Sequence, residues 1–348
     1  MTVAFEELID SLQQEGVANV EEHVAAFRRA DTKRSAHSDP DRLLAYLYAA
    51  NVIDEQQYRS IHSSEIARVT DIAGLRRGGW AKGSVQRRYS PVGLIGSGSM
   101  GKVYVARESD LNRKVAFKQI SSAFQSDEHL MRRFVAEVQI TAQLNHPNVV
   151  PVYGLEATPE GSLGYAMKLV QGQTLEEIIN DAMDRYDARQ PVSENRELKE
   201  RLDYFVRVCD AVAYAHTRGV VHGDLKPANI MVGSFGKIYV MDWGLARLIS
   251  SEDLDPENTV DVTSDGETSP AEEEGQAIGT PAYMSPEQAR GLDSRLSHLD
   301  SKSDQYALGL ILQELVTLWP AIDGETTDEV MKKAGSGFRN PFKHLGRG

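Results

Sequence analysis

Four polar residues around a predicted hairpin have the types and spacing to hold a metal ion and to move a proton. Asp224 and Lys226 lie in the segment HGDLKPAN, which ends at Asn229, and Asp242 follows the next apolar run. If the two apolar runs between Asn229 and Asp242 pair as antiparallel strands, these two residues come side by side at the open end of the hairpin. Mg²⁺ takes one or two protein oxygens together with phosphates and waters, so the pair suits Mg²⁺. Ordinary polar turn residues are the simpler alternative, but they do not explain why charged and amide groups gather at both ends.

A glycine-rich segment, GSGSMGKV, runs from Gly96 to Val103 between two predicted strands. Its glycines allow the backbone to approach a bulky anion, for which a triphosphate is the natural candidate. The segment alone is weak evidence, because glycine-rich hairpin turns are at least as common. A dinucleotide-binding fold is disfavoured, since its glycine-rich loop would open a helix rather than join two strands.

Lys118 and Glu137 are a second candidate pair. On a strand, Lys118 shares one face with Ala116 and Ile120. In the helix predicted over residues 129–144, Glu137 falls within the apolar arc. A carboxylate there is costly unless it is paired. An ion pair with Lys118 would satisfy both residues and leave the ammonium able to contact phosphate oxygens, whereas two unrelated surface charges are the alternative.

These residues fall in two regions of different secondary structure. The first is a small sheet with one helix, and its β-rich runs cover residues 91–95, 102–107, 114–120, 149–154 and 165–170. After Gly172 the pattern is mainly helical, apart from the hairpin formed by residues 230–232 and 238–241. Residues 1–70 show helical periodicity, and a glycine-rich basic segment follows them. The sequence therefore predicts an α+β protein with two lobes, preceded by a small helical region.

The composition limits the class of protein. The chain has 348 residues, of which 41% are hydrophobic, and no apolar run is long enough for a membrane span. The single cysteine and an N-terminus without a signal peptide predict a cytoplasmic protein. The net charge of −13 argues against a nucleic-acid partner, and ten of the acidic residues lie between residues 251 and 275, which predicts a solvated, disordered insert. The oligomeric state is not indicated.

The order of these motifs resembles that of eukaryotic-type serine/threonine protein kinases, in the variety found in bacteria. The match runs from about Tyr89 to Trp319, and it includes DWG at Asp242, GTPAYMSPE ending at Glu287 and a helix that carries Asp304. The resemblance implies a bilobal kinase-like fold with a β-rich N-lobe and a helical C-lobe. The implied division is a helical region of unknown role at 1–75, a linker at 76–88 and a kinase domain at 89–348, with the N-lobe at 89–167, the hinge at 168–170 and the C-lobe at 171–348.

The resemblance also implies a reaction, the transfer of the γ-phosphate of Mg-ATP to serine or threonine hydroxyls of proteins. Asp224 would accept the hydroxyl proton, and Lys226 would steady the γ-phosphoryl group. Lys118, held by Glu137, would contact the α- and β-phosphates. Asn229 and Asp242 would hold Mg²⁺, or Mn²⁺ in its place. The implied nucleotide-binding residues are Gly96, Ser97, Gly98, Gly101, Val103, Ala116, Lys118, Met167 as gatekeeper, and Lys168 and Val170 in the hinge.

Two departures from the family pattern leave an alternative open. Gly223 stands where an arginine usually precedes the catalytic aspartate, which removes the usual clamp on a phosphorylated activation loop. The chain also ends without the last helices of a typical kinase lobe, so we expect a fragment of a longer protein. A pseudokinase or nucleotide-binding scaffold without turnover is the alternative. Retention of Lys118, Glu137, Asp224, Asn229 and Asp242 favours the enzyme.

Overall fold

The computed structural model divides into two compact units, which are described separately. One comprises residues 1–125 and 153–171, and the other comprises residues 126–152 and 172–348. The structure describes residues 5–14, 16–30, 40–54, 57–58, 88–97, 101–121, 127–157, 162–190, 197–244, 246–248, 259–260, 279–291 and 300–342. The predicted linker at 76–88 lies outside these ranges except for Arg88, and so does most of the acidic segment.

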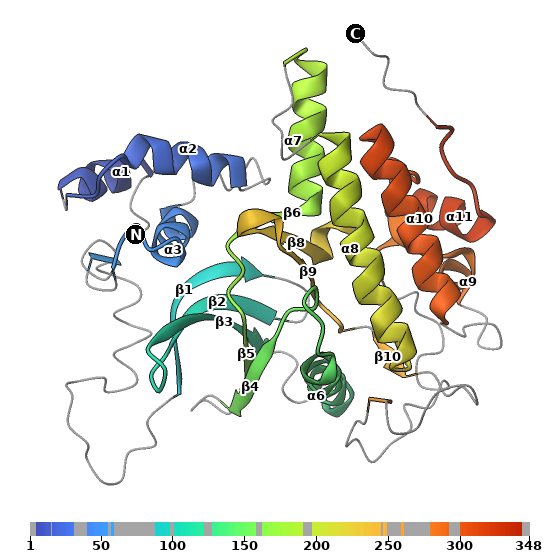
Figure 1. Ribbon diagram of the computed structural model, residues 1–348, viewed down its shortest axis with the longest axis horizontal. Coiled ribbons are helices and arrows are strands. Elements are labelled where there is room, and N and C mark those ends of the chain that lie inside the picture. Colours follow the sequence, from blue (N-terminus) through green and yellow to red (C-terminus); the bar gives the residue numbers. More distant parts are fainter. Residues whose placement is uncertain are drawn as a thin grey trace. The chain divides into compact units, whose positions relative to one another are not determined.

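In its described residues, the first unit contains three helices and a five-stranded sheet (Figure 1). The helices are α1 (Phe5–Gln14), α2 (Val20–Ala30) and α3 (Pro40–Ala49). The strands are β1 (Tyr89–Ser97), β2 (Gly101–Glu108), β3 (Arg113–Ile120), β4 (Val152–Ala157) and β5 (Leu163–Met167), in the order β1-β2-β3-β5-β4. β1, β2 and β3 form an antiparallel meander within the small sheet that the β-rich runs predict. A register shift between Pro91 and Gly93 makes a bulge in β1.

The second unit is mainly helical. Its helices are α6 (Glu128–Gln143), α7 (Leu175–Asp187), α8 (Leu198–Thr217), α9 (Pro286–Arg290), α10 (Ser301–Thr317) and α11 (Thr327–Ser336). Its strands are β6 (Gly172–Thr174), β7 (Val220–Val221), β8 (Ile230–Gly233), β9 (Ile238–Val240) and β10 (Arg247–Leu248), and they form the small sheets β6-β8-β9 and β10-β7. This composition confirms the predicted α+β class with a β-rich and a helical lobe.

Helix α8 carries the core of the second unit. Its buried side chains recur at helical spacing, so they form one stripe, which comprises Tyr204, Val208, Ala211, Val212 and Ala215. The stripe belongs to one apolar cluster with Ile311 and Leu315 of α10 and Leu175 of α7. α7 begins with a capping box between Thr174 and Glu177, and the Asp300 side chain caps α10, so both helix starts are satisfied locally.

Helix α6 is attached to the second unit through the segment that follows it. The Asn148 carbonyl accepts from the Val240 amide at 2.7 Å, and the Val150 amide donates to the Val240 carbonyl at 3.2 Å. Val149 forms a parallel bridge with Val240, so the predicted run at 149–154 was set too early, and strand β4 begins only at Val152. Helix α6 and the segment that follows it therefore belong with β9.

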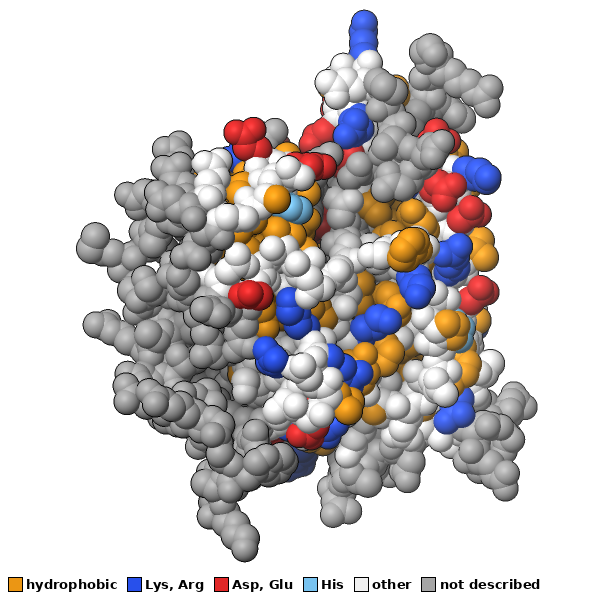
Figure 2. Space-filling view, turned by 60° about the vertical axis from the view of Figure 1, so that its left-hand side comes forward, with side chains coloured by type: hydrophobic (Ala, Val, Ile, Leu, Met, Phe, Trp, Pro, Cys, Tyr) orange, Lys and Arg blue, Asp and Glu red, His pale blue; other side chains and the backbone are white. Residues whose placement is uncertain are grey.

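The surface in view in Figure 2 shows lysine, arginine and apolar side chains mixed across its middle. Apart from residues 259 and 260, the acidic segment at 251–275 lies outside the described ranges, so the disordered insert stays a prediction. Within those ranges, no helix has the length and hydropathy to cross a bilayer. The cytoplasmic location likewise stays a prediction.

Candidate functional site

The predicted hairpin forms. Strands β8 and β9 pair antiparallel, with Ile230 opposite Val240. The Met241 amide then donates to the Asn229 carbonyl at 2.9 Å, which closes the ladder at the open end. Asn229 therefore lies directly before β8, and Asp242 lies two residues after the end of β9. The sequence prediction for this pair of residues is confirmed at the level of the backbone.

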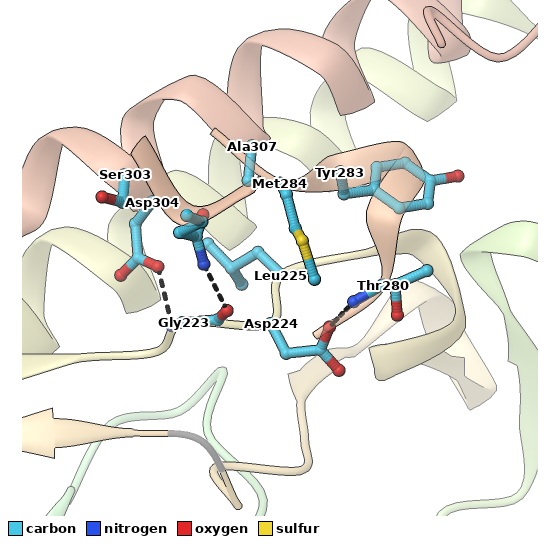
Figure 3. A pocket seen from close by; sticks show the side chains of 10 residues that line it. Gly223, Asp224, Leu225, Thr280, Tyr283, Met284, Ser303, Asp304 and Ala307 are labelled. Carbon is cyan, nitrogen blue, oxygen red and sulfur yellow. Dashed lines mark hydrogen bonds between the residues drawn. The ribbon is translucent and has the colours of Figure 1, made fainter. Parts of the chain in front are cut away.

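Two predicted site residues, Lys226 and Asn229, converge with Thr280 on the Asp224 carboxylate. Its Oδ2 accepts from Lys226 Nζ at 2.7 Å and from Asn229 Nδ2 at 3.3 Å. Its Oδ1 accepts from the Thr280 amide at 2.9 Å, a bond drawn in Figure 3. Lys226 Nζ also donates to Thr280 Oγ1 at 2.6 Å, so the lysine bridges the two residues. A carboxylate with a cation and an amide beside it is a proton acceptor whose orientation is held from both sides.

Asn229 and Asp242 present oxygen donors that fit a hard divalent cation. Asn229 Nδ2 donates to the Asp224 carbonyl at 2.9 Å, which uses the amide NH₂ and leaves Oδ1 as an acceptor. Asp242 adds an exposed carboxylate, and its backbone φ of 61° lies in the left-handed region, which aspartate tolerates better than most residues. An amide oxygen and a carboxylate are donors that Mg²⁺ accepts. In the described part of the chain, no group of three or more His, Cys, Asp or Glu side chains could hold a metal.

Asp304 holds the backbone that leads into Asp224. Its Oδ1 accepts from the Gly223 amide at 3.0 Å, and its Oδ2 accepts from the His222 amide and from His216 Nε2, both at 2.8 Å. Asp304 is only 2% exposed, so these bonds satisfy a buried charge. The Gln288 side chain donates to the Gly223 carbonyl at 2.9 Å from the other side.

Gly223 adopts a conformation that suits glycine. Its φ is 78°, where a side chain would be strained. The residue that departs from the family pattern is thus held by Asp304 at its amide and by Gln288 at its carbonyl. The position next to Asp224 is fixed by these two bonds rather than by a side chain of its own.

His222 and Trp243 tie the two ends of the site together. His222 Nε2 donates to the Met241 carbonyl at 3.1 Å, and its Nδ1 accepts from the Asp224 amide at 3.3 Å. The Trp243 ring is buried, with its centre 4.6 Å from that of His222. Trp243 therefore packs as a large aromatic residue in the core of the second unit.

Glu137 lies beside the segment that carries Asp242. It is almost fully buried, and a Cβ added to Gly244 would lie 3.0 Å from its Oε2. A side chain at position 244 would therefore be in tighter contact with Glu137 than side chains ordinarily make. Lys118 belongs to the other compact unit, where its Nζ lies 5.8 Å from the centre of the Tyr165 ring. The Lys118–Glu137 ion pair stays a prediction.

The predicted nucleotide-binding residues of the first unit share one face of its sheet. Val103 pairs with Lys118, and Ala116 pairs with Met167, so these four side chains point to the same side. Gly96 and Ser97 end β1, and Gly101 begins β2 so close to the Gln119 carbonyl that no side chain fits. Lys168 and Val170 follow β5, and Gly98 lies outside the described residues.

Three residues of the site escaped prediction or had no assigned contact. Thr280 and Gln288 belong to the GTPAYMSPEQ segment, but nothing in the sequence shows that they bond to residues 56 and 65 positions away. Glu314 accepts from Tyr283 Oη at 2.6 Å, and burial raises the pKa of Glu314 to about 7. The burial of Glu314 could have been predicted from the sequence, because this carboxylate lies among apolar residues of the helix after Asp304.

The chain is similar to known proteins over most of its length. The family described as "Protein kinase domain" matches residues 89–344. A serine/threonine-protein kinase PknD of Chlamydia muridarum is 35% identical over 237 residues, which cover 67% of this chain and 25% of that protein. The protein of the same name from Protochlamydia amoebophila is 34% identical over 259 residues, covering 70% of this chain and 24% of that protein. The chain thus spans about a quarter of the length of these curated relatives.

Proposed function

Because the chain belongs to the protein kinase family, we propose that it is a serine/threonine kinase that transfers the γ-phosphate of ATP to hydroxyl groups of proteins. The observation that carries the proposal is the arrangement around Asp224. One carboxylate is within hydrogen-bond distance of Lys226, Asn229 and Thr280. This arrangement supplies a base, a cation and a metal-ligand candidate at one point.

Each residue has a role that follows from its contacts. Asp224 takes the proton of the substrate hydroxyl as the hydroxyl oxygen forms its bond to the γ-phosphorus. The bond from that phosphorus to the bridging oxygen breaks, and ADP leaves with the electron pair. Lys226 bridges Asp224 and Thr280, so its ammonium lies where it stabilises negative charge on the transferring group. Asn229 and Asp242 would hold Mg²⁺, which neutralises charge on the phosphates when bound.

The first unit would supply the nucleotide site. Lys118 would contact the α- and β-phosphates, and residues 96–103 would cover them. The shared face of Val103, Ala116 and Met167 supports an apolar surface for the adenine ring beside the lysine. The hinge residues Lys168 and Val170 would offer backbone groups to that ring. Pairing of Lys118 with Glu137 completes this proposal.

The contacts of Lys226 and Thr280 support the proposal that serine and threonine hydroxyl groups accept the phosphoryl group. The lysine lies two positions after Asp224 and bonds both Asp224 and Thr280. The segment from Gly279 to Glu287 would shape a site for a peptide, and its Tyr283 is fixed by Glu314. We therefore propose protein substrates rather than small molecules.

A radiolabelled ATP assay with a generic protein substrate tests the assignment. We expect Asp224→Ala to lower incorporation by at least about a hundredfold, because the proton acceptor is lost. Asp187→Ala, at the exposed end of α7, is a control that should behave as wild type. Equal incorporation by Asp224→Ala and wild type would disprove the base. Incorporation by neither, with ATP still bound, would favour the nucleotide-binding scaffold.

The metal assignment has a separate test. Asp242→Asn removes the carboxylate charge and keeps the side-chain shape, so it should weaken ATP affinity in the presence of Mg²⁺ more than in its absence. Isothermal titration with and without Mg²⁺ measures both affinities. If the two change equally, Asp242 does not bind the metal.

A further inference from the structure

The N-terminal helices belong to the same compact unit as the nucleotide-facing sheet, and no role has been assigned to them. Helices α1 to α3 and residues up to Tyr58 fall in the first unit with β1 to β5. We call the described residues between 5 and 58 the N-terminal module. Its contacts with the sheet carry an inference that rests on the proposed function.

Helix α3 is buried on more than one side. Of residues 43–49, all except Tyr46 are buried. At 3.6 residues per turn these buried positions span about 240° of the helix circumference. A helix that packs only in a small bundle buries a narrower stripe. A second surface must therefore cover α3.

That second surface is formed by β1 and β2. Val92 and Val105 belong to one apolar cluster with Leu43, Leu44 and Leu47 of α3. Figure 1 shows α3 beside the sheet at β1. The cluster also includes buried residues of α1 and α2, so the core of the N-terminal module continues into the sheet without a break.

The contact is so close that a side chain at position 93 would force part of the N-terminal module to shift. A Cβ added to Gly93 would lie 2.7 Å from Tyr58 Oη and 3.1 Å from Ala45 Cβ. Both distances are below ordinary van der Waals contact, and they involve two different parts of the N-terminal module. The bulge at residues 91–93 turns both Val92 and Gly93 towards it.

The covered face is the one that carries Lys118. Gly93 pairs with Val105, and Val105 pairs with Ala116, so these three residues share a face. Ala116 and Lys118 are two residues apart on β3 and point the same way. The N-terminal module therefore lies on the proposed nucleotide side of the sheet, not on its opposite side.

Lys114, on the same face, binds the end of α3. Its ammonium donates to Asn51 Oδ1 at 2.7 Å and to the Tyr48 carbonyl, and it lies 3.8 Å from the centre of the Tyr48 ring. The last carbonyls of a helix have no partner within the helix and carry its negative dipole end. A strand of the sheet thus supplies the cation that caps α3.

The predicted hinge makes the remaining contacts. Gln171 donates its side-chain amide to the Ala49 carbonyl, the last residue of α3. Leu169, between the predicted hinge residues Lys168 and Val170, packs against the apolar cluster, and so does Ile95, which precedes the glycine-rich segment. Gln171 therefore joins the predicted hinge to the N-terminal module, and Ile95 places the start of the glycine-rich segment against the cluster that the module and the sheet share.

We propose that the N-terminal module positions β1, β2 and residues 168–171, and that its docking sets the affinity of the kinase for nucleotide. Lys114 and Gln171 are positioning residues, because they act through β3 and the hinge, whereas Tyr58 supplies the surface against which Gly93 packs. Displacing the module would move Ile95 and Leu169 and weaken the nucleotide site. The chemical step, which depends on Asp224 in the other unit, would be less affected.

A wedge at Gly93 and its relief test this proposal in the full 348-residue chain. Gly93→Ala places a methyl group against Tyr58 Oη, so it should raise the Kd and KM for Mg-ATP by about tenfold with a much smaller change in kcat. Tyr58→Phe removes that hydroxyl and alone should stay within about twofold of wild type. The double variant should recover most of the lost affinity, which general destabilisation by two substitutions would not produce.

Gly154→Ala is the matched control. This glycine lies in β4 of the same sheet, and an added Cβ would meet Tyr89 Oη at 3.2 Å, whereas no part of the N-terminal module is among its nearest atoms. Gln171→Ala is a milder second variant that removes one bond without a clash, and it should raise the Kd by about threefold. Both are compared with wild type by titration with Mg-ATP.

Hydrogen exchange separates this inference from the proposed function. In the absence of nucleotide, Gly93→Ala should speed amide exchange in β1 and in residues 168–171, and Tyr58→Phe should reverse the effect. If wild type binds no ATP, the proposed function is wrong, and exchange still shows whether the N-terminal module holds these segments. If Gly93→Ala speeds exchange but leaves the ATP affinity unchanged, the N-terminal module does not control nucleotide affinity. Exchange and affinity that match Gly154→Ala would refute the docking role altogether.

Discussion

The buried Glu314 makes a quantitative prediction about stability and pH. Burial raises the pKa of Glu314 from 4.5 to about 7, with the Glu176 charge adding to the rise and the hydrogen bond from Tyr283 opposing it. Below about pH 4.5 both the folded and unfolded states are protonated, so no free energy is lost. As pH rises, the unfolded state ionises first and is favoured. Stability therefore falls between pH 4.5 and about 7 and stays lowered above that window.

The magnitude follows from the size of the shift. A difference of about 2.5 pKa units corresponds to a loss of about 3 kcal/mol above pH 7, as an upper limit. Glu314→Gln cannot ionise, and its amide oxygen can still accept from Tyr283 Oη. The free energy of unfolding of Glu314→Gln minus that of wild type should therefore increase by about 2 kcal/mol between about pH 5.5 and pH 8.

Urea denaturation of both proteins at several pH values measures this difference, and subtraction removes the other titrating groups. Tyr283→Phe removes the donor to the carboxylate, so it should steepen the wild-type trend. Glu329→Gln is the matched control, because the Glu329 side chain is 44% exposed and Lys333 lowers its pKa, which predicts no such increase. A Glu314→Gln difference that is flat with pH would refute the buried-carboxylate reasoning.

Three further predictions concern the backbone next to Asp224. Gly223→Arg introduces a side chain at φ 78°, so it should lower the free energy of unfolding by about 1–2 kcal/mol without creating a functional clamp. Thermal unfolding measures this loss, and an unchanged midpoint would show that the backbone at position 223 is not strained by a side chain. Gln288→Ala loses its bond to the Gly223 carbonyl and its capping bond with Ser285, so kcat should fall more than KM rises, whereas an unchanged kcat would show that Asp224 needs no such support. Asp304→Asn places an NH₂ where three donors converge, and a loss of about 3 kcal/mol in urea denaturation is expected, against Asp300→Asn as the milder control.

Local sequence patterns were sufficient to predict how much of the site is arranged. The hairpin between Asn229 and Asp242 depends on two short apolar runs and a glycine-bounded turn, and the structure has this pairing. The alternation that put Lys118 on a face with Ala116 is a property of any strand, so the register confirms it. Such features involve residues that are close in sequence and have few conformations to choose from.

Contacts between distant segments were decided by packing. Asp304 bonds to backbone amides more than 80 positions away, and Lys114 bonds to Asn51, 63 positions away. Neither bond leaves a periodic trace in the sequence, because it depends on where whole elements come to rest. The early placement of β4 had the same cause, since Val149 pairs with Val240 in a different sheet region.

The sequence by itself determined the chemical groups, their order along the chain and the type of element that carries each of them. Only the tertiary structure decided that Thr280 and Gln288 support Asp224, and that the N-terminal module covers the Lys118 face of the sheet. The physical reason is the distance along the chain over which each effect acts. Backbone propensity and hydrophobic period act over a few residues, whereas burial of α3 on two sides and the fit at Gly93 exist only once the helices and the sheet are packed.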